Sequence, residues 1–496
     1  MKKLIKKITS MKVVLCLFLI SASLFMYYVF SLQILNMEYN LAVGAVLVFI
    51  LLISLLIYRS GLKRRPNKSS KRITIVKVMN LLLSVLLLFT SYYLYRGNQF
   101  IANVTGTSEE LYIITVYALQ GSALEEVDDL SDQITGVSYQ YDTETITSAV
   151  IHFDEIVEDF DYVAYDDYIS LTTALYSYDV DTIMIGEEHE QVIEEVYPDF
   201  LDETKVIATY ELTRETTVTT IPVEVTEESF NVYITGIDSY GSIDTVSRSD
   251  VNIIATINPT TKQILLTSIP RDMQITLATS GQMDKLTHAA IYGEDESIAT
   301  LENFLEIEIN YYAKTNFTGI IDIIDALGGL EIDSPYGFTS ADVTGNVVIE
   351  EGYNLLDGTE TLAFVRERSA LPSGDYDRAR NQQLVIEALV DKVSSATVIT
   401  EFSSILDAVE DSFKTDLSSN EIKALLNMQL SDMASWEIYS VQVLGDSYKT
   451  AYTYSMWGTE IYVTEPYEYT LSAIQELIDR VQNDELITEE DVEGLQ

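Results

Sequence analysis

Cysteine is almost absent from this chain of 496 residues, because Cys16 is its only one. No intramolecular disulfide can therefore form, and no zinc site that needs two thiolates. Positive charge is also scarce, since 30 Lys and Arg stand against 77 Asp and Glu, for a formal net charge of -47. This balance excludes a protein that binds nucleic acid through a basic surface. Of the three histidines, His152 and His189 stand apart from other candidate ligands, and we expect them to be structural.

The few basic residues are unevenly distributed. Residues 1–97 contain 14 of the 30, with Glu38 as their single acidic residue, so residues 98–496 carry a net charge of -60. The first part is also apolar. Its uncharged stretches at about 13–37, 39–58 and 78–95 each approach the roughly 20 residues that a helix needs to cross a bilayer. We therefore predict that 1–97 is a membrane anchor with three transmembrane helices.

Basic residues precede the first predicted span and fill the loop at 59–77. The positive-inside rule then places the N-terminus in the cytoplasm and residues 98–496 outside the cell. The absence of cysteine from this large extracellular part fits a bacterial surface better than a eukaryotic secretory route. A cleaved signal peptide is the alternative, but the apolar stretch is too long for one and two further spans follow it.

The extracellular part divides by texture. Residues 98–107 are predicted to be a linker, 108–225 a small acidic α/β accessory domain, and 230–482 a larger α/β domain with a mixed central sheet flanked by helices. Within the larger domain, 361–369 has the pattern of a strand and 376–394 that of a helix. The tail at 483–496 is acidic and is predicted to be disordered.

Half of the eight arginines beyond residue 98 fall within 15 positions: Arg366, Arg368, Arg378 and Arg380. On a strand, Arg366 and Arg368 would point to the same side. On a helix that begins near residue 375, Arg378 and Gln382 would share one face, with Arg378 in the first turn, where the dipole favours an anion. The planar guanidinium group suits phosphate oxygens, so the cluster indicates a phosphate or pyrophosphate site. Salt bridges to nearby carboxylates are the alternative.

A second cluster contains carboxylates. Asp238 ends one predicted strand and Asp250 begins the next, so their side chains could converge. Two carboxylates suit Mg²⁺, whose coordination is usually completed by water and substrate phosphates. Arg271 and Asp272 follow another predicted strand. Carboxylates that hold a metal, together with converging arginines, are typical of phosphoryl transfer; turn capping is the alternative role for Asp238 and Asp250.

Seven short motifs between residues 230 and 395 resemble the LytR-CpsA-Psr family of cell-envelope proteins. In chain order they are Arg248-Ser249-Asp250, Ser268-Ile269-Pro270-Arg271-Asp272, Asp284-Lys285-Leu286-Thr287-His288-Ala289, Asp325-Ala326-Leu327-Gly328-Gly329, Leu356-Asp357-Gly358, Val365-Arg366-Glu367-Arg368, and Gly374-Asp375-x-x-Arg378 through Gln382-Gln383. The three spans and the acidic domain that precedes these motifs resemble the capsule-operon CpsA/Wzg branch. There the accessory domain is likened to DNA polymerase processivity factors, but its acidity here excludes DNA as a partner.

The resemblance implies an α/β sandwich with a hydrophobic groove for a polyprenyl chain. It implies an enzyme that moves a capsular or other cell-wall glycan from an undecaprenyl-pyrophosphate carrier to peptidoglycan, through a phosphodiester. By the same resemblance, Mg²⁺ is the cofactor with Asp238 and Asp250 as ligands, and capsule-assembly membrane proteins are further partners. It also implies a multi-pass protein in the plasma membrane of a Gram-positive-type bacterium. The pyrophosphate contacts implied are Arg248, Arg271, Arg366, Arg368, Arg378 and Gln382, with catalytic roles for Arg271, Asp272, Arg366 and Arg368. Many members read Arg-Gln-Gln where this chain has Asn381-Gln382-Gln383, which puts one phosphate contact in question.

Two further interpretations stay open at this point. Asp272 is our candidate for the base that takes the acceptor's proton, and the apolar stretch 317–327 could wall the lipid groove or belong to the core.

The protein could instead be a non-catalytic regulator of capsule synthesis that binds lipid-linked polymer and signals through its spans. An acidic cation-binding surface protein is the third hypothesis, and it leaves the arginine cluster unexplained.

Overall fold

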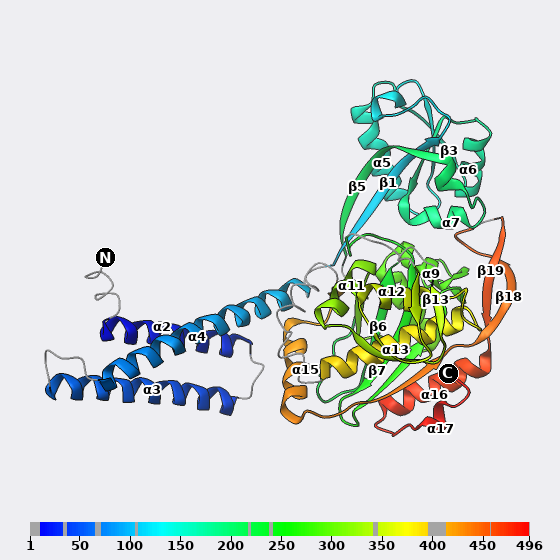
Figure 1. Cartoon of the computed structure of the whole chain (residues 1–496). Helices are drawn as coiled ribbons and strands as arrows, with labels where there is room; N and C mark the ends of the chain where they lie inside the picture. The colour runs from blue at the N-terminus through cyan, green and yellow to red at the C-terminus, as the bar shows by residue number, and fades with distance from the viewer. Residues whose placement is uncertain are drawn as a thin grey trace. The chain divides into compact units, whose positions relative to one another are not determined.

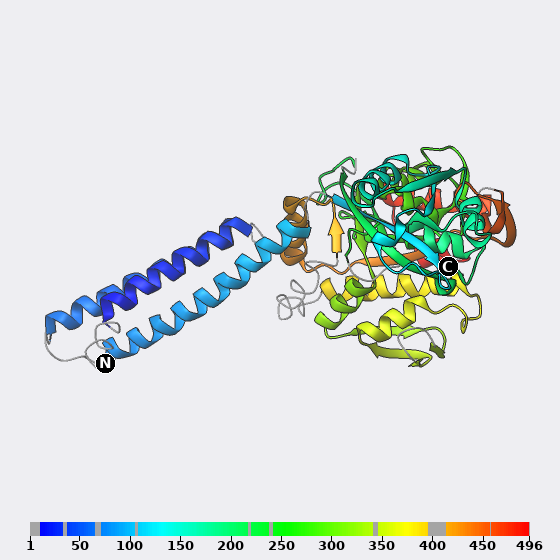
Figure 2. The ribbon, with the colours of Figure 1, turned by 90° about the horizontal axis from the view of Figure 1, so that it is seen from above.

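The computed structural model describes residues 10–32, 37–64, 71–104, 108–216, 220–237, 242–340, 346–394, 413–456 and 458–495. The chain forms two compact units. The first consists of 1–105, 394–410 and 417–434, and the second of the remaining residues. In the first unit, three long apolar helices lie side by side (Figures 1 and 2). They are α2 (Met11–Leu32), α3 (Met37–Arg64) and α4 (Lys71–Val104).

All three helices are long and apolar enough to cross a membrane. Inside the bundle, Asn80 lies buried on α4, and its amide nitrogen donates to the Ser54 hydroxyl on α3 at 2.9 Å and to the Val76 carbonyl at 2.8 Å. A buried amide in an apolar bundle needs such partners, so this contact fixes how α3 and α4 face each other.

The first part of the predicted linker at 98–107 is helical, because α4 continues to Val104. No proline interrupts this stretch, and one glycine, Gly97, costs a helix only about 1 kcal/mol. The first unit also contains α15 (Ser419–Asp432). Ser418 caps this helix in a capping box with Glu421, as the sequence pattern indicates.

The second unit begins with the acidic accessory domain, which is built on a five-stranded mixed sheet of order β3-β2-β4-β1-β5. β1 pairs antiparallel with β4 and β5, while β2 is parallel to β3 and β4. The strands are β1 (Ser108–Leu119), β2 (Ile134–Ser138), β3 (Asp161–Tyr165), β4 (Thr182–Gly186) and β5 (Thr204–Thr216). The short helices η1 (Val127–Leu130) and η2 (Glu187–His189) lie in its connections.

Helices cover both faces of this sheet because side chains alternate along its strands. On β1, Ile114 and Val116 pack with α5 (Thr143–Ile156), whereas Tyr117, the residue after Val116, faces the other layer with α6 (Tyr168–Tyr176) and α8 (Phe200–Glu203). The short helix α7 (Glu190–Glu194) follows β4 and η2. Figure 1 shows α7 at the lower end of the accessory domain.

A six-stranded mixed sheet of order β16-β11-β6-β7-β8-β17 forms the centre of the larger domain. β7 pairs antiparallel with both β6 and β8, the pairs β11–β6 and β8–β17 are parallel, and β16 at the edge pairs antiparallel with β11. The strands are β6 (Phe230–Ile237), β7 (Ser249–Asn258), β8 (Gln263–Ser268), β11 (Tyr311–Thr315), β16 (Phe413–Thr415) and β17 (Glu437–Gln442).

One face of this sheet packs on α10 (Glu294–Leu305) and α16 (Glu468–Gln482), with Leu265, Leu301 and Ile474 fully buried between the layers. Figure 1 shows α13 (Asp375–Ser394) running across the opposite side. Small hairpins complete the domain: β9 (Gln274–Thr276) with β10 (Met283–Lys285), β12 (Leu330–Ser334) with β15 (Gly352–Leu356), β13 (Phe338–Ser340) with β14 (Val347–Ile349), and β18 (Gly445–Tyr452) with β19 (Glu460–Pro466). The short helices α9 (Leu286–Ala289) and η3 (Ala290–Tyr292) precede α10.

The strand predicted at 361–369 is wrong, because this stretch forms the helix α12 (Gly358–Arg366). Asp357 caps it, and Glu360 returns the hydrogen bond as the second half of a capping box. The helix begins directly against α11 (Phe317–Ala326): a Cβ on Gly358 would lie 2.3 Å from the carbonyl oxygen of Ile321. Glycine at 358 therefore allows the close approach of these two helices.

The predicted disorder of 483–496 is also wrong for the residues that the structure describes. α17 (Glu489–Val492) forms there, and Ile487, Val492 and Leu495 are buried in the same core as α16. Three apolar side chains among many acidic ones are enough to dock the segment, because burying each contributes about 1.5–3 kcal/mol. The last part of the chain also hydrogen-bonds to the sheet, since the Leu495 carbonyl accepts from the backbone N–H of Gln442 at 2.6 Å.

Candidate active site

The topology of the central sheet brings distant segments to one of its ends. Because β7 is antiparallel to both neighbours, its first residues lie beside the last residues of β6 and β8. Asp250 at the start of β7 therefore meets the segment that follows β8, which carries Arg271. α13 begins close by and brings Arg378 in its first turn, three residues after Asp375.

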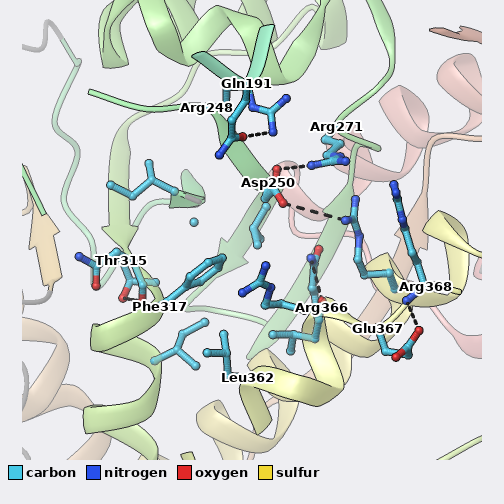
Figure 3. Close-up of a pocket in the computed structure, with 18 of the residues that line it drawn as sticks. Gln191, Arg248, Asp250, Arg271, Thr315, Phe317, Leu362, Arg366, Glu367 and Arg368 are labelled. Atoms are coloured by element: carbon cyan, nitrogen blue, oxygen red, sulfur yellow. Dashed lines mark hydrogen bonds and ion pairs between the residues drawn. The ribbon is translucent and has the colours of Figure 1, made fainter. Parts of the chain in front are cut away.

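A single cavity of about 850 Å³ lies at this end of the sheet (Figure 3). Its wall joins residues from β7, α11, α12 and α13 with residues of the accessory domain. The polar lining includes Gln191, Glu194, Glu195, Arg248, Asp250, Arg271, Arg366, Glu367, Arg368, Arg378 and Gln382. Five guanidinium groups around one cavity, in a chain with so few, favour an anionic ligand of high charge.

Asp250 lies at the centre of the arginines. Its carboxylate accepts from Arg271 Nη1 at 2.7 Å, and its second oxygen lies 4.0 Å from Arg378 Nη1. Burial alone would raise the pKa of Asp250, but the guanidinium groups of Arg271, Arg378 and Arg248 outweigh it, so the pKa lies below its ordinary value. Asp250 is thus a charged counter-ion that holds the arginines in place without a bound ligand.

The two nearest arginines respond in opposite directions. Burial would lower the pKa of Arg271, yet the carboxylates of Asp250 and Asp272 raise it above its ordinary value. Burial, together with the like charge of Arg271, lowers the pKa of Arg378, although Asp250 and Asp375 act against this. An incoming phosphate would relieve the repulsion between these two guanidinium groups, which favours binding of a polyanion.

The wall across from Arg248 is apolar. Figure 3 shows Phe317 and Leu362 on this side, with Arg366 between them and the other arginines. The Arg366 guanidinium carbon lies 4.2 Å from the centre of the Phe317 ring, a cation–π distance. Ile320 and Val365 also line this side. The prediction that 317–327 could wall a groove therefore holds for Phe317 and Ile320, while Ile324 and Leu327 are buried in the core. The cavity is thus amphiphilic, with an apolar wall beside a cationic one.

The predicted pyrophosphate contacts all lie in this cavity. Arg248, Arg271, Arg366, Arg368, Arg378 and Gln382 line it, although Arg366 ends α12 and Arg368 follows beyond the helix, rather than sharing one face of a strand. Gln382 is buried and its amide nitrogen lies 3.4 Å from the Val365 carbonyl, which ties α13 to α12. Six residues from 248 to 382 in sequence are thus brought together by the fold.

Asp272, also predicted as a site residue, does not line this large cavity. Asp272 lines a small adjacent cavity of about 10 Å³ that shares Asp250, Arg271, Arg378 and Gln382 with the large one. Its carboxylate lies 3.2 Å from Lys285 Nζ and 3.7 Å from Arg271 Nε. Asp238 lies outside the described residues.

The residue in question at position 381 is turned inward. Asn381 is buried and donates to the Phe364 carbonyl at 3.0 Å. Its neighbour Arg380 is not among the described residues that line either of these two cavities. The structure therefore gives no support for Arg380 as a replacement for the family's arginine.

For Mg²⁺, the described residues offer Asp250 as one possible carboxylate ligand. Within the described ranges no three His, Cys, Asp or Glu side chains are grouped as a metal site. A site with one or two carboxylates and substrate phosphates needs no such group. Asp250 fits that kind of site, because its carboxylate faces the cavity and both of its oxygens are near groups that would also bind phosphate.

Sequence reasoning missed the part that the accessory domain plays in this cavity. Gln191, Glu194 and Glu195 lie on or directly after α7 and line the cavity wall. Nothing in their own spacing distinguishes them from the many acidic and amide residues around them. Glu367 was missed as well, although it stands between two predicted site residues, Arg366 and Arg368.

The protein has an α/β fold and three helices of the membrane-spanning type. Its cavity suits an anionic amphiphile. The family model described as the LytR_cpsA_psr family matches residues 200–466, which is more than half of the chain. The protein therefore belongs to the LytR-CpsA-Psr family, as the seven motifs predicted.

Curated relatives have transferase names. The polyisoprenyl-teichoic acid–peptidoglycan teichoic acid transferase TagU of Enterococcus faecalis (strain ATCC 700802 / V583) is 36% identical over 208 residues, which are 40% of this chain and 65% of TagU. The corresponding transferase TagV of Bacillus subtilis (strain 168) is 31% identical over 247 residues, 49% of this chain and 60% of TagV. The match thus spans less than two thirds of each of these two relatives. Among solved structures, B. subtilis TagV is 28% identical over 52% of this chain and 98% of that chain, with a TM-score of 0.44.

Proposed function

We propose that this protein is a membrane-anchored glycan phosphotransferase. Its donor is a capsular or other cell-wall glycan on an undecaprenyl-pyrophosphate carrier, and its acceptor is peptidoglycan. The observation that carries the proposal is the amphiphilic cavity, in which five arginines and Gln382 meet beside the apolar wall of Phe317, Ile320 and Leu362. A polyprenyl pyrophosphate has the same division into a polyanion and an apolar chain. The transferase names of the relatives agree with this assignment.

In the proposed reaction, a hydroxyl oxygen of peptidoglycan forms a bond to the phosphorus atom that carries the glycan. The bond from that phosphorus to the bridging oxygen of the pyrophosphate breaks, and polyprenyl phosphate leaves with the electron pair. Arg271 and Arg378 lie where they can hold the phosphate oxygens and stabilise the charge that develops on the leaving group. Arg366, stacked on Phe317, lies at the border between the phosphate and the lipid.

The proton of the acceptor hydroxyl must pass to a base. Asp272 remains our candidate, and its place in the adjacent small cavity makes a direct test necessary. Asp272→Asn should abolish transfer while the affinity for inorganic pyrophosphate stays near that of the wild type. Transfer by this variant at the wild-type rate would assign the base elsewhere.

We also propose Mg²⁺ as cofactor, with Asp250 as a ligand and Asp238 as the second. When bound, the ion would supply further stabilisation of phosphate charge. Asp250→Asn separates two roles. If Asp250 is only a counter-ion, the variant binds pyrophosphate more tightly with or without Mg²⁺, because a negative charge has gone. If it is a ligand, Mg²⁺ strengthens pyrophosphate binding by the wild type and not by the variant.

Our proposal for location is the plasma membrane, with the N-terminus in the cytoplasm and residues 98–496 extracellular, next to capsule-assembly membrane proteins. Three apolar helices and the charge distribution around them support it.

A lipid-extraction experiment tests the donor. The full chain and its Arg366→Ala/Arg368→Ala variant are purified from cells that make polyprenyl lipids, transferred to amphipol, and extracted with organic solvent for mass spectrometry. We expect polyprenyl phosphate or pyrophosphate with the wild type and much less with the variant. Equal amounts in both would place the lipid outside the cavity. No lipid in either, with folded protein, would count against a lipid-linked donor.

A further inference from the structure

The accessory domain reaches into the arginine cavity through α7. Gln191 on this helix accepts a hydrogen bond through its Oε1 from the Arg248 guanidinium group, and Figure 3 shows the pair at the side of the cavity away from Phe317. The Arg248 side chain is only 11% exposed. The amide itself brings no charge, so this contact fixes the direction of the guanidinium group, while the Glu195 carboxylate lies 3.9 Å from Arg248 Nη1 as its ion-pair partner.

Glu195, which follows α7 directly, fastens this helix to the larger domain. Its two oxygens each accept from Lys285 Nζ at 2.9 Å, and one lies 3.5 Å from His288 Nε2. Burial alone would raise the pKa of Glu195, but His288 and Lys285 lower it to about 2, so the group is charged. Lys285 is not among the described residues that line the cavity, so the ion pair anchors the wall from behind.

Apolar packing seats the same helix. Val192 on α7 is buried in one cluster with Ile291, Met456 and Ile461 of the larger domain. Burying a valine side chain contributes about 1.5–3 kcal/mol. Gln191 is thus followed, within four residues, by a buried apolar contact at Val192 and a charged anchor at Glu195, which leaves its amide little freedom to move away from Arg248.

We infer that the accessory domain is part of the active site: Gln191 is a positioning residue that holds Arg248 in the cavity and so sets its affinity for pyrophosphate. Glu195 is the anchor that keeps Gln191 in register with Arg248. The inference rests on the proposed function only for the identity of the substrate, because the positioning itself concerns any pyrophosphate bound by the arginines. It gives the acidic domain a role at the site of chemistry.

The test compares Gln191→Ala with Glu155→Gln in the full chain in detergent micelles. Glu155 is an exposed carboxylate on α5 of the same domain and serves as the control. Isothermal titration with inorganic pyrophosphate gives the dissociation constant, and transfer assays with a short-chain polyprenyl-pyrophosphate saccharide give kcat and KM. We expect Gln191→Ala to raise the dissociation constant and KM by about three- to tenfold, the equivalent of one net hydrogen bond, with the melting temperature of the control.

A double-mutant cycle separates positioning from a general loss of structure. In an Arg248→Ala background, Gln191→Ala should have no further effect on pyrophosphate affinity, because its only proposed action is through Arg248. A further loss in that background, or a single variant that binds as tightly as the control, would overturn the inference.

The two readouts also separate this inference from the proposed function. Weakened pyrophosphate binding by Gln191→Ala, in a wild type that transfers no glycan, would support the inference and overturn the proposed function. A wild type that transfers glycan, with an unchanged KM in Gln191→Ala, would do the reverse. A wild type that neither binds pyrophosphate nor transfers glycan would overturn both.

Discussion

Replacing Arg271 by alanine removes the guanidinium group closest to the centre of the cavity. This group donates to Asp250 at 2.7 Å and lies 3.7 Å from Asp272. Its loss leaves the partly buried Asp250 carboxylate with the Arg378 guanidinium group, whose Nη1 lies 4.0 Å away. We therefore expect two separate effects, one on the stability of the fold and one on catalysis.

The magnitudes follow from the geometry. Removing one partner of a buried ion pair costs about 3–5 kcal/mol, because the other charge stays in a poorly solvated place. The side chains of Arg271 and Asp250 are 16% and 18% exposed, so the lower figure applies to this pair. At about 2–4 °C per kcal/mol, the lower figure corresponds to a melting temperature reduced by about 6–12 °C. For catalysis, loss of one donor to developing charge lowers kcat by about 10²–10³. The pKa of Asp250 should also rise, because Arg271 is the group that lowers it most.

The double variant Asp250→Asn/Arg271→Ala distinguishes the two effects. It removes the uncompensated carboxylate as well, so most of the melting temperature should return while transfer stays low. Thermal unfolding and a transfer assay on Arg271→Ala, Asp250→Asn, the double variant and the wild type make the comparison. Recovery of transfer along with stability would refute the view that Arg271 acts on the substrate, and a single Arg271→Ala variant with wild-type stability would refute the ion-pair argument.

Three further expectations concern other parts of the molecule. Glu195 stays charged in the folded state down to about pH 2, against an ordinary pKa of 4.5, so the unfolding free energy should fall by up to about 3 kcal/mol as the pH drops from 4.5 towards 2. Denaturant titrations should show a smaller fall for Glu195→Gln, and an equal fall would contradict the assignment. Gly358→Ala should destabilise the protein by about 1–3 kcal/mol, because its Cβ would meet the Ile321 carbonyl at 2.3 Å. Gly121→Ala, whose Cβ meets no atom within 4 Å, is its control for thermal unfolding. Arg380→Ala should leave pyrophosphate affinity within about twofold of the wild type, as for a substitution away from the site; a larger loss in titration would restore Arg380 to the binding residues.

The arginines of the site could be predicted from the sequence because positive charge is so scarce. In a chain with 77 acidic residues, an arginine that serves only solubility has little reason to cluster with others. Arg366, Arg368 and Arg378 were found in this way, and the motif resemblance added Arg248. Their place on the fold was predicted less well, because the apolar run before Arg366 suits a buried strand and a buried helix equally. The capping residues Asp357 and Glu360 carried the missing signal.

The contribution of the accessory domain could not be predicted. Gln191 and Glu195 are ordinary residue types in a region rich in both charge and amides, and their partners Arg248 and Lys285 lie 57 and 90 positions away. Such pairing depends on how two separately built sheets pack together, which no local pattern records. The docking of the tail was also missed, for a different reason. The acidic composition of 483–496 predicted disorder, although the fold buries the three apolar side chains of Ile487, Val492 and Leu495.

The last residues that the structure describes have a consequence for the central sheet. β17 is one of the two outermost strands, and an outermost strand offers unpaired backbone groups to any other extended chain. Here the carbonyl of Leu495 accepts a hydrogen bond from the backbone N–H of Gln442, and α17 packs beside the strand. The segment 487–495 thus shields this edge against intermolecular strand pairing. A chain that has not yet synthesised it presents an open edge, so protection from aggregation is among the last features that the folding domain acquires.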